Sequence, residues 1–145
     1  MSTVNLAQAE SIIVAALQHG RAASFKPLTV AVLDAGGHLV ALQREDNSSL
    51  LRPQIAIGKA WGALGLGMGG RDLAKRAAAA PSFMGAMSDL SGGNMVPVPG
   101  GVLIRDANAK VIGAVGVTGD VSENDEACAL AGIKKAGLIA DPGAA

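Results

Sequence analysis

The sequence predicts one α+β domain spanning residues 1–145, with helices attached to an antiparallel sheet. Two pairs of apolar stretches, each joined by a turn segment rich in Gly, Asp or Asn, indicate β-hairpins over 28–44 and 102–118. Stretches with helical spacing precede, separate and follow these hairpins. This order favours an antiparallel α+β fold over a parallel α/β arrangement.

The composition indicates an aliphatic core and a neutral surface. Hydrophobic residues make up 50% of the chain but aromatic residues only 2%, so Ala, Val, Leu and Ile must fill the core. Twelve basic and twelve acidic side chains cancel without a basic run, so neither nucleic acid nor an anionic membrane is an expected partner. The single cysteine, Cys128, excludes an internal disulfide and a cysteine-based zinc site. With no secretory pattern and no bilayer-spanning apolar run, we expect a cytoplasmic protein.

The first third of the chain reads as a helix followed by a hairpin. Asn5 and Gln8 resemble a helix start. The residues with helical spacing on its apolar face are Leu6, Ala9, Ile13, Ala16, Leu17 and Gly20. Strands are expected over 28–33 and 38–44 around the turn 34–37, and residues 45–49 form a polar loop.

A helix over 53–68 begins at Pro53, which suits a first helical turn. Apolar residues surround nearly the whole helix, so it must be covered nearly all round. Its own sheet covers one face. We expect the other to pack against a second subunit, and the alternative is the next helix of the same chain.

Two short helices, 71–80 and 82–90, lead into a glycine-rich loop that ends at Gly101. The second hairpin pairs 102–105 with 111–118, and the last helix begins at Ser122, which forms a capping-box pattern with Asp125. Residues 141–145 are expected to fray.

Glu123 is the main candidate site residue. On a helix it falls on the same side as the apolar Leu130, whereas Asp125 points the opposite way. An inward carboxylate needs a cation, hydrogen-bond donors or a ligand. Lys59, Arg44 and Arg52 are the possible cationic partners, in a ligand site or in a structural ion pair.

The glycines of the loop and of the following strand each allow a ligand-binding and a purely structural interpretation. Gly100 and Gly101 could present backbone N–H groups to an anion, or could serve turn geometry alone. Gly113 and Gly116 weaken a strand, so we expect either a packed helix or a flat ligand close to it.

His19 and His38 are the only imidazoles. Either could ligate a haem iron or transfer protons, and either could equally be an ordinary surface residue. Cys128 is interpreted as a small hydrophobic or subunit-contact residue. No Ser-His-Asp order, phosphate loop or dinucleotide fingerprint occurs.

Several segments together resemble the GlcG/HbpS family, the haem-binding or "haem-degrading" domain related to the carboxyl domain of the corrinoid adenosyltransferase PduO. The matching segments are Val30–Val40, Ile57–Ala60, Val96–Gly101, Ile112–Gly119, Glu123–Glu126 and Ala131–Gly132. The resemblance implies a profilin-like three-layer α/β/α fold with a five-stranded antiparallel sheet. It also implies assembly into dimers, tetramers or octamers.

The resemblance also suggests the ligand. Haem or a related tetrapyrrole is the expected cofactor of a small-molecule-binding protein, with His19 as the candidate axial metal ligand. Gly100, Gly101 and Thr118, which lie in matching segments, are the other candidate cofactor contacts.

Two alternatives remain open. The first is an enzyme acting on a small hydroxy or oxo acid, in which Glu123 is the acid/base and Lys59 or Arg44 holds the substrate carboxylate. Glycine-loop N–H groups would then polarise a carbonyl. The second alternative is an accessory or structural subunit.

Overall fold

The computed structural model describes residues 2–144, which form five helices and five strands. In chain order these are α1 (Leu6–Ala22), β1 (Thr29–Asp34), β2 (Leu39–Arg44), α2 (Arg52–Leu66), α3 (Gly70–Ala79), α4 (Pro81–Leu90), β3 (Gly101–Arg105), β4 (Val111–Thr118), α5 (Ser122–Lys135) and β5 (Ile139–Asp141). Among the described residues, no helix combines the length and apolarity needed to cross a membrane.

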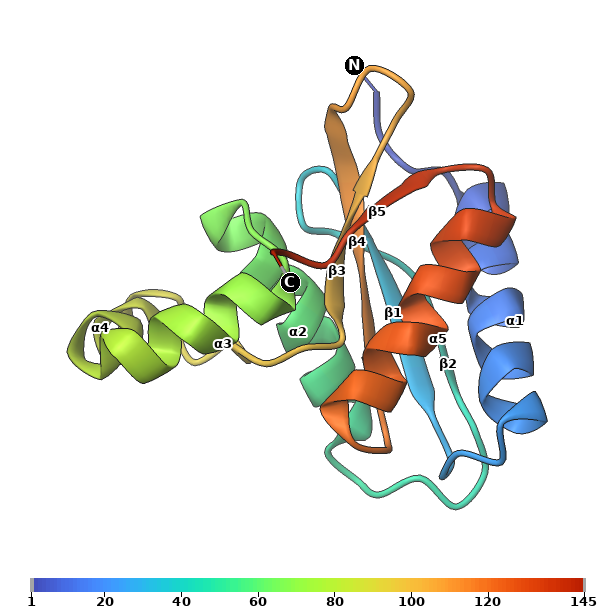
Figure 1. Ribbon diagram of the computed structural model, residues 1–145, viewed down its shortest axis with the longest axis horizontal. Helices are drawn as coiled ribbons and strands as arrows, with labels where there is room; N and C mark the ends of the chain where they lie inside the picture. Colours follow the sequence, from blue (N-terminus) through green and yellow to red (C-terminus); the bar gives the residue numbers. More distant parts are fainter. Residues whose placement is uncertain (1, 145) are drawn as a thin grey trace.

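The five strands form one antiparallel sheet in the order β2-β1-β4-β3-β5. Helices α1 and α5 pack side by side on one face, and α2 covers the other face (Figure 1). The predicted α+β class, with a five-stranded antiparallel sheet between helical layers, is therefore confirmed.

The described part of the carboxyl-terminal tail does not fray as the sequence predicted, and residue 145 lies outside the described residues. Asp141 pairs with Leu103 at the edge of the sheet, and the Pro142 carbonyl accepts a hydrogen bond from the Arg71 amide. A strand of three residues, Ile139–Asp141, is too short to leave a recognisable alternating pattern in the sequence. It forms because β3 offers it an unpaired edge.

Most of the large apolar residues lie between the sheet and the α1–α5 layer. Ile12 and Ile13 of α1, Val30 and Val32 of β1, and Ile133 of α5 are fully buried there. The predicted helix start is confirmed, because the Asn5 and Gln8 side chains accept hydrogen bonds from each other's backbone amides. The other face of the sheet holds a smaller cluster under α2.

Small residues allow α2 to approach the sheet closely. A side chain at Gly116 would collide with the backbone of α2 at Ala56 and Ala60. Of the two interpretations of this glycine strand, a packed helix is therefore the one observed. On the flank of α2, Gly58 and Gly62 face the chain segment around Met95 and Val96.

Helices α3 and α4 project from the body of the molecule as an arm (Figure 1). Leu73 of α3, Met84 of α4 and Met95 form a small buried cluster inside this arm. Leu73 also lies against Gly62 of α2. Part of α2 is thus covered by its own chain, while Ile57 and Trp61 are half-buried.

The hairpin β1–β2 contains an irregularity. Val32 pairs with Ala41 and Leu33 pairs with Leu39, which leaves Val40 as an extra residue on the edge strand β2. An extra residue of this kind is a β-bulge, and it bends and twists the strand that contains it.

Candidate functional site

The inward face of α5 differs from the prediction. Glu123 is exposed, whereas Asp125 is 1% and Glu126 is 6% exposed. The buried residues of α5 are Asp125, Glu126, Cys128, Ala129, Gly132 and Ile133. The prediction that Glu123 faces inward was wrong because it took the more apolar Ala127, Leu130 and Ala131 as the buried side, and these are only half-buried.

The start of α5 was placed correctly but its cap was not. The helix begins at Ser122, yet Val121 is the N-cap residue and no side chain caps the helix in the usual way. Asp125 instead accepts a hydrogen bond from the Asp120 amide at 2.9 Å. The Asp120 carboxylate accepts bonds from the Lys26 and Val121 amides, and these bonds lower the pKa of Asp120.

Asp125 forms a buried ion pair with Lys59 of α2. The Lys59 Nζ lies 3.0 Å from Asp125 Oδ2 and donates a second bond, of 2.9 Å, to the Val117 carbonyl. Burial lowers the pKa of Lys59 and raises that of Asp125, and the attraction between the two charges opposes both shifts. The pair links α2, β4 and α5 through the end of the sheet.

Gly100 and Gly101 make room for this ion pair. Gly100 has a φ of 113°, and a side chain there would meet the Lys59 ammonium and the Val117 carbonyl. A side chain at Gly101 would collide with the Lys59 backbone. Both glycines are buried, and the atoms nearest to them belong to Lys59 and β4.

Thr118 lies at the same end of the sheet and is held by Arg52. The Arg52 Nη1 donates to Thr118 Oγ1 at 2.7 Å, and the Arg52 Nε donates to Ser49 Oγ at 3.1 Å. Arg44 is exposed at the end of β2 and donates to the Ser48 carbonyl. Arg44 and Arg52 therefore both bind the loop that precedes α2, and Arg52 also binds Thr118.

Glu123 lines a separate hollow of about 460 Å³ between α5, Pro99 and Arg71. Arg71 forms a two-pronged ion pair with Glu126, in which its Nε lies 2.9 and 3.0 Å from the two carboxylate oxygens. This hydrogen bonding raises the pKa of Arg71. Glu123 thus faces a different part of the molecule from Lys59.

His19 is exposed near the end of α1, and its ring meets Phe25 edge-on at a centroid distance of 6.1 Å. His38 is also exposed and lies 3.1 Å from Asp34 in the first hairpin turn. Within residues 2–144, no cluster of three or more His, Cys, Asp or Glu could hold a metal ion.

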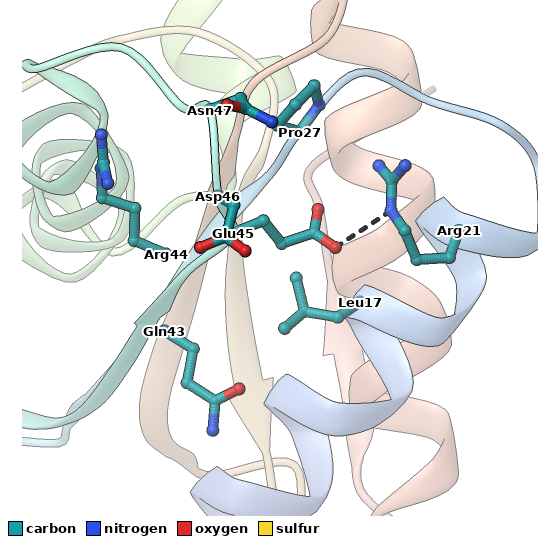
Figure 2. A pocket seen from close by; sticks show the side chains of 8 residues that line it. All are labelled: Leu17, Arg21, Pro27, Gln43, Arg44, Glu45, Asp46 and Asn47. Carbon is teal, nitrogen blue, oxygen red and sulfur yellow. Dashed lines mark ion pairs between the residues drawn. The ribbon is translucent and has the colours of Figure 1, made fainter.

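A further hollow, of about 480 Å³, lies between α1, β2 and the loop that follows β2. Figure 2 shows its lining side chains, which include the ion pair of Arg21 with Glu45 at 3.0 Å. In this view Arg44 points away from the ion pair, toward α2 (Figure 2).

The structure therefore brings some predicted site residues together and separates others. Lys59, Gly100 and Gly101 are in contact, and Thr118 joins them at the same end of the sheet. His19 and Glu123 have other surroundings. Sequence reasoning missed Asp125 as the partner of Lys59, although its spacing with Ala129, Gly132 and Ile133 carried the signal.

Comparisons with known proteins agree with this architecture. The family described as haem degrading protein HbpS-like matches residues 4–134. An uncharacterised 15.0 kDa protein from the dhaT-dhaS intergenic region of Citrobacter freundii is 32% identical over 99 residues, which is 68% of either chain.

Solved structures superpose over nearly the whole chain. The Klebsiella pneumoniae protein ORFY is 26% identical with a TM-score of 0.84, covering 94% of this chain and 92% of that one. A double mutant of Streptomyces reticuli HbpS is 26% identical with a TM-score of 0.80, covering 92% and 87%. The PduOC protein, solved as a complex with haem, has a TM-score of 0.84 at 20% identity and so shares the fold. On the match over residues 4–134, this chain belongs to the HbpS-like family.

Proposed function

We propose that this protein is an oligomeric small-molecule-binding member of the HbpS-like family, with haem or a related tetrapyrrole as its ligand. The family match over residues 4–134 is the observation that carries this proposal. Similarity to HbpS and to a protein solved with haem supports it. We also retain the expectation that the protein acts in the cytoplasm.

The residues around His19 fit a haem in part. An axial ligand must reach the iron, and the His19 imidazole is exposed. Phe25 beside it offers an aromatic surface. Self-association is a separate part of the proposal, and α2, which covers the other face of the sheet, is the surface through which we expect copies of the chain to assemble.

Titration with haemin tests the proposal. The wild type should shift the Soret band saturably, and His19→Ala should abolish or strongly weaken that shift. His38→Ala is the matched control, because the His38 side chain is also exposed but lies in the first hairpin turn. A wild type without a Soret shift would remove haem as the ligand. Equal binding by His19→Ala would remove His19 as the axial residue.

The geometry gives no support to an enzyme built on Glu123 with Lys59. The Lys59 ammonium is bound to Asp125 and the Val117 carbonyl, and it is 4% exposed. Glu123 is exposed and lines the hollow between α5, Pro99 and Arg71, which Lys59 does not line. We therefore attach no catalytic step to these residues.

A further inference from the structure

Two arginines at one end of the sheet lack an acidic partner. Arg21, Arg71 and Arg105 each form an ion pair with a carboxylate. Within residues 2–144, Arg44 and Arg52 form none, and their hydrogen bonds go to neutral oxygens. Each guanidinium has five N–H donors, so both retain donors for another acceptor.

These two guanidinium groups converge on the same short segment. Arg44 donates to the carbonyl of Ser48, and Arg52 donates to the hydroxyl of the next residue, Ser49. Both guanidinium groups therefore bind consecutive residues of the loop that precedes α2. Figure 2 shows Arg44 extending from β2 to the side away from the Arg21–Glu45 ion pair.

Two threonine residues, Thr29 and Thr118, are the neighbours of Arg44 across the sheet. In the strand register Arg44 pairs with Thr29, and Thr29 pairs with Thr118. Directly paired residues point to the same face, which here is the face under α2, because Gly116 two residues from Thr118 contacts α2. The Thr29 hydroxyl is fully buried and has no hydrogen-bond partner. The region thus holds more polar groups than its own contacts satisfy.

The positive charge also affects Lys59. Burial lowers the pKa of Lys59, and the charge of Arg52 lowers it further against the opposing effect of Asp125. An acidic partner bound to Arg52 would relieve this repulsion, and among residues 2–144 no carboxylate forms an ion pair with Arg52.

We propose that Arg44 and Arg52 bind the carboxylate group of a small organic acid, with Arg52 held in place by the buried Thr118 hydroxyl. The guanidinium fork matches the two oxygens of a carboxylate. Phosphate sites at helix starts use backbone amides. Here Pro53 has no amide hydrogen, and the amides of Arg52 and Ile55 already bond to the Ser49 and Leu51 carbonyls. This site does not depend on haem.

The test is a titration of the whole protein with succinate and, separately, with acetate. Binding is monitored by the NMR chemical shifts of the backbone amides of residues 44–52 and 118. Inorganic phosphate at matched ionic strength forms the second arm. Succinate should bind saturably and more tightly than phosphate. Arg44→Gln and Arg52→Gln should each weaken binding by about tenfold, as expected for loss of a charge-assisted hydrogen bond.

Arg76→Gln is the matched control, because Arg76 is exposed and its described contact is with the Phe83 ring. It should leave succinate binding unchanged. Arg44 is exposed, so Arg44→Gln should fold normally even if loss of the Arg52–Thr118 bond destabilises the other variant. Absence of saturable binding would overturn the proposal, as would tighter binding of phosphate or equal weakening by Arg76→Gln.

Discussion

Gly116 shows how a single residue fixes the distance between a helix and the sheet. Its missing side chain lets the α2 backbone at Ala56 lie directly on β4. Gly116→Ala would force these two backbones apart. Overpacking of a core costs about 1–3 kcal/mol of unfolding free energy. We expect the upper end of this range, because the backbone of α2 can move aside less easily than a side chain could. Urea unfolding of the variant measures the loss.

Gly85→Ala is the control for that substitution. Gly85 lies within α4, and an added methyl group there would meet no atom within 4 Å. Alanine favours a helix over glycine by about 0.5–1 kcal/mol, so this variant should be slightly more stable. If Gly116→Ala unfolded at the wild-type urea concentration, the close approach would have no energetic importance.

The sequence alone predicted that something lies close to Gly116, since glycine weakens a strand. It left open whether that was a helix or a ligand. A glycine in a strand indicates that a side chain would not fit there, but it does not indicate what occupies the space. The role of Gly100 was harder to predict, because it serves Lys59, which is 41 residues earlier in the chain.

At the scale of elements, the Lys59–Asp125 pair joins α2 to α5. Lys59→Met would leave the Asp125 charge buried without its cation, and removal of one partner of a buried pair costs about 3–5 kcal/mol. The double variant Lys59→Met/Asp125→Asn removes both charges and keeps an oxygen for the Asp120 amide. We expect it to recover most of the lost stability in urea unfolding.

The decisive comparison is between the stability of the double variant and that of the two single variants. If the double variant were as unstable as the sum of the two single variants, the charges would not be coupled and the ion pair would not explain the link between the helices. Loss of packing by the Lys59 stem would then be the alternative cause.

The α5 helix also shows the limits of sequence reasoning at this scale. Its start at Ser122 was predictable. Its inward face was assigned wrongly, because that face has two carboxylates and the half-buried Leu130 favoured the other side of the helix. Asp125 and Glu126 are buried only because Lys59 and Arg71, from the two helices α2 and α3, supply opposite charges. Such compensation is a tertiary contact that helical periodicity does not contain.

For the whole molecule, we predict self-association along α2. Leu51, at the start of this helix, is 62% exposed and lines an apolar hollow of about 410 Å³ beside the helix. Leu51→Glu would place a charge on that surface without disturbing the core. Light scattering after size-exclusion chromatography should give a multiple of 14.4 kDa for the wild type and a smaller mass for the variant.

Leu90→Glu serves as the matched control, since Leu90 is 81% exposed at the end of α4 and does not line that hollow. It should leave the mass unchanged. A wild type that elutes as a clean monomer would refute self-association.

The extra residue Val40 in β2 has a consequence for how the chain behaves at high concentration. β2 is an outer strand of the sheet, so one side of its backbone has no partner strand in the fold. A flat outer strand is a template on which another chain can add a strand of its own and begin a fibril, and a bulge twists it out of that geometry. Deleting Val40 would straighten the strand, and the molecule would then lose a built-in protection against amyloid-like stacking.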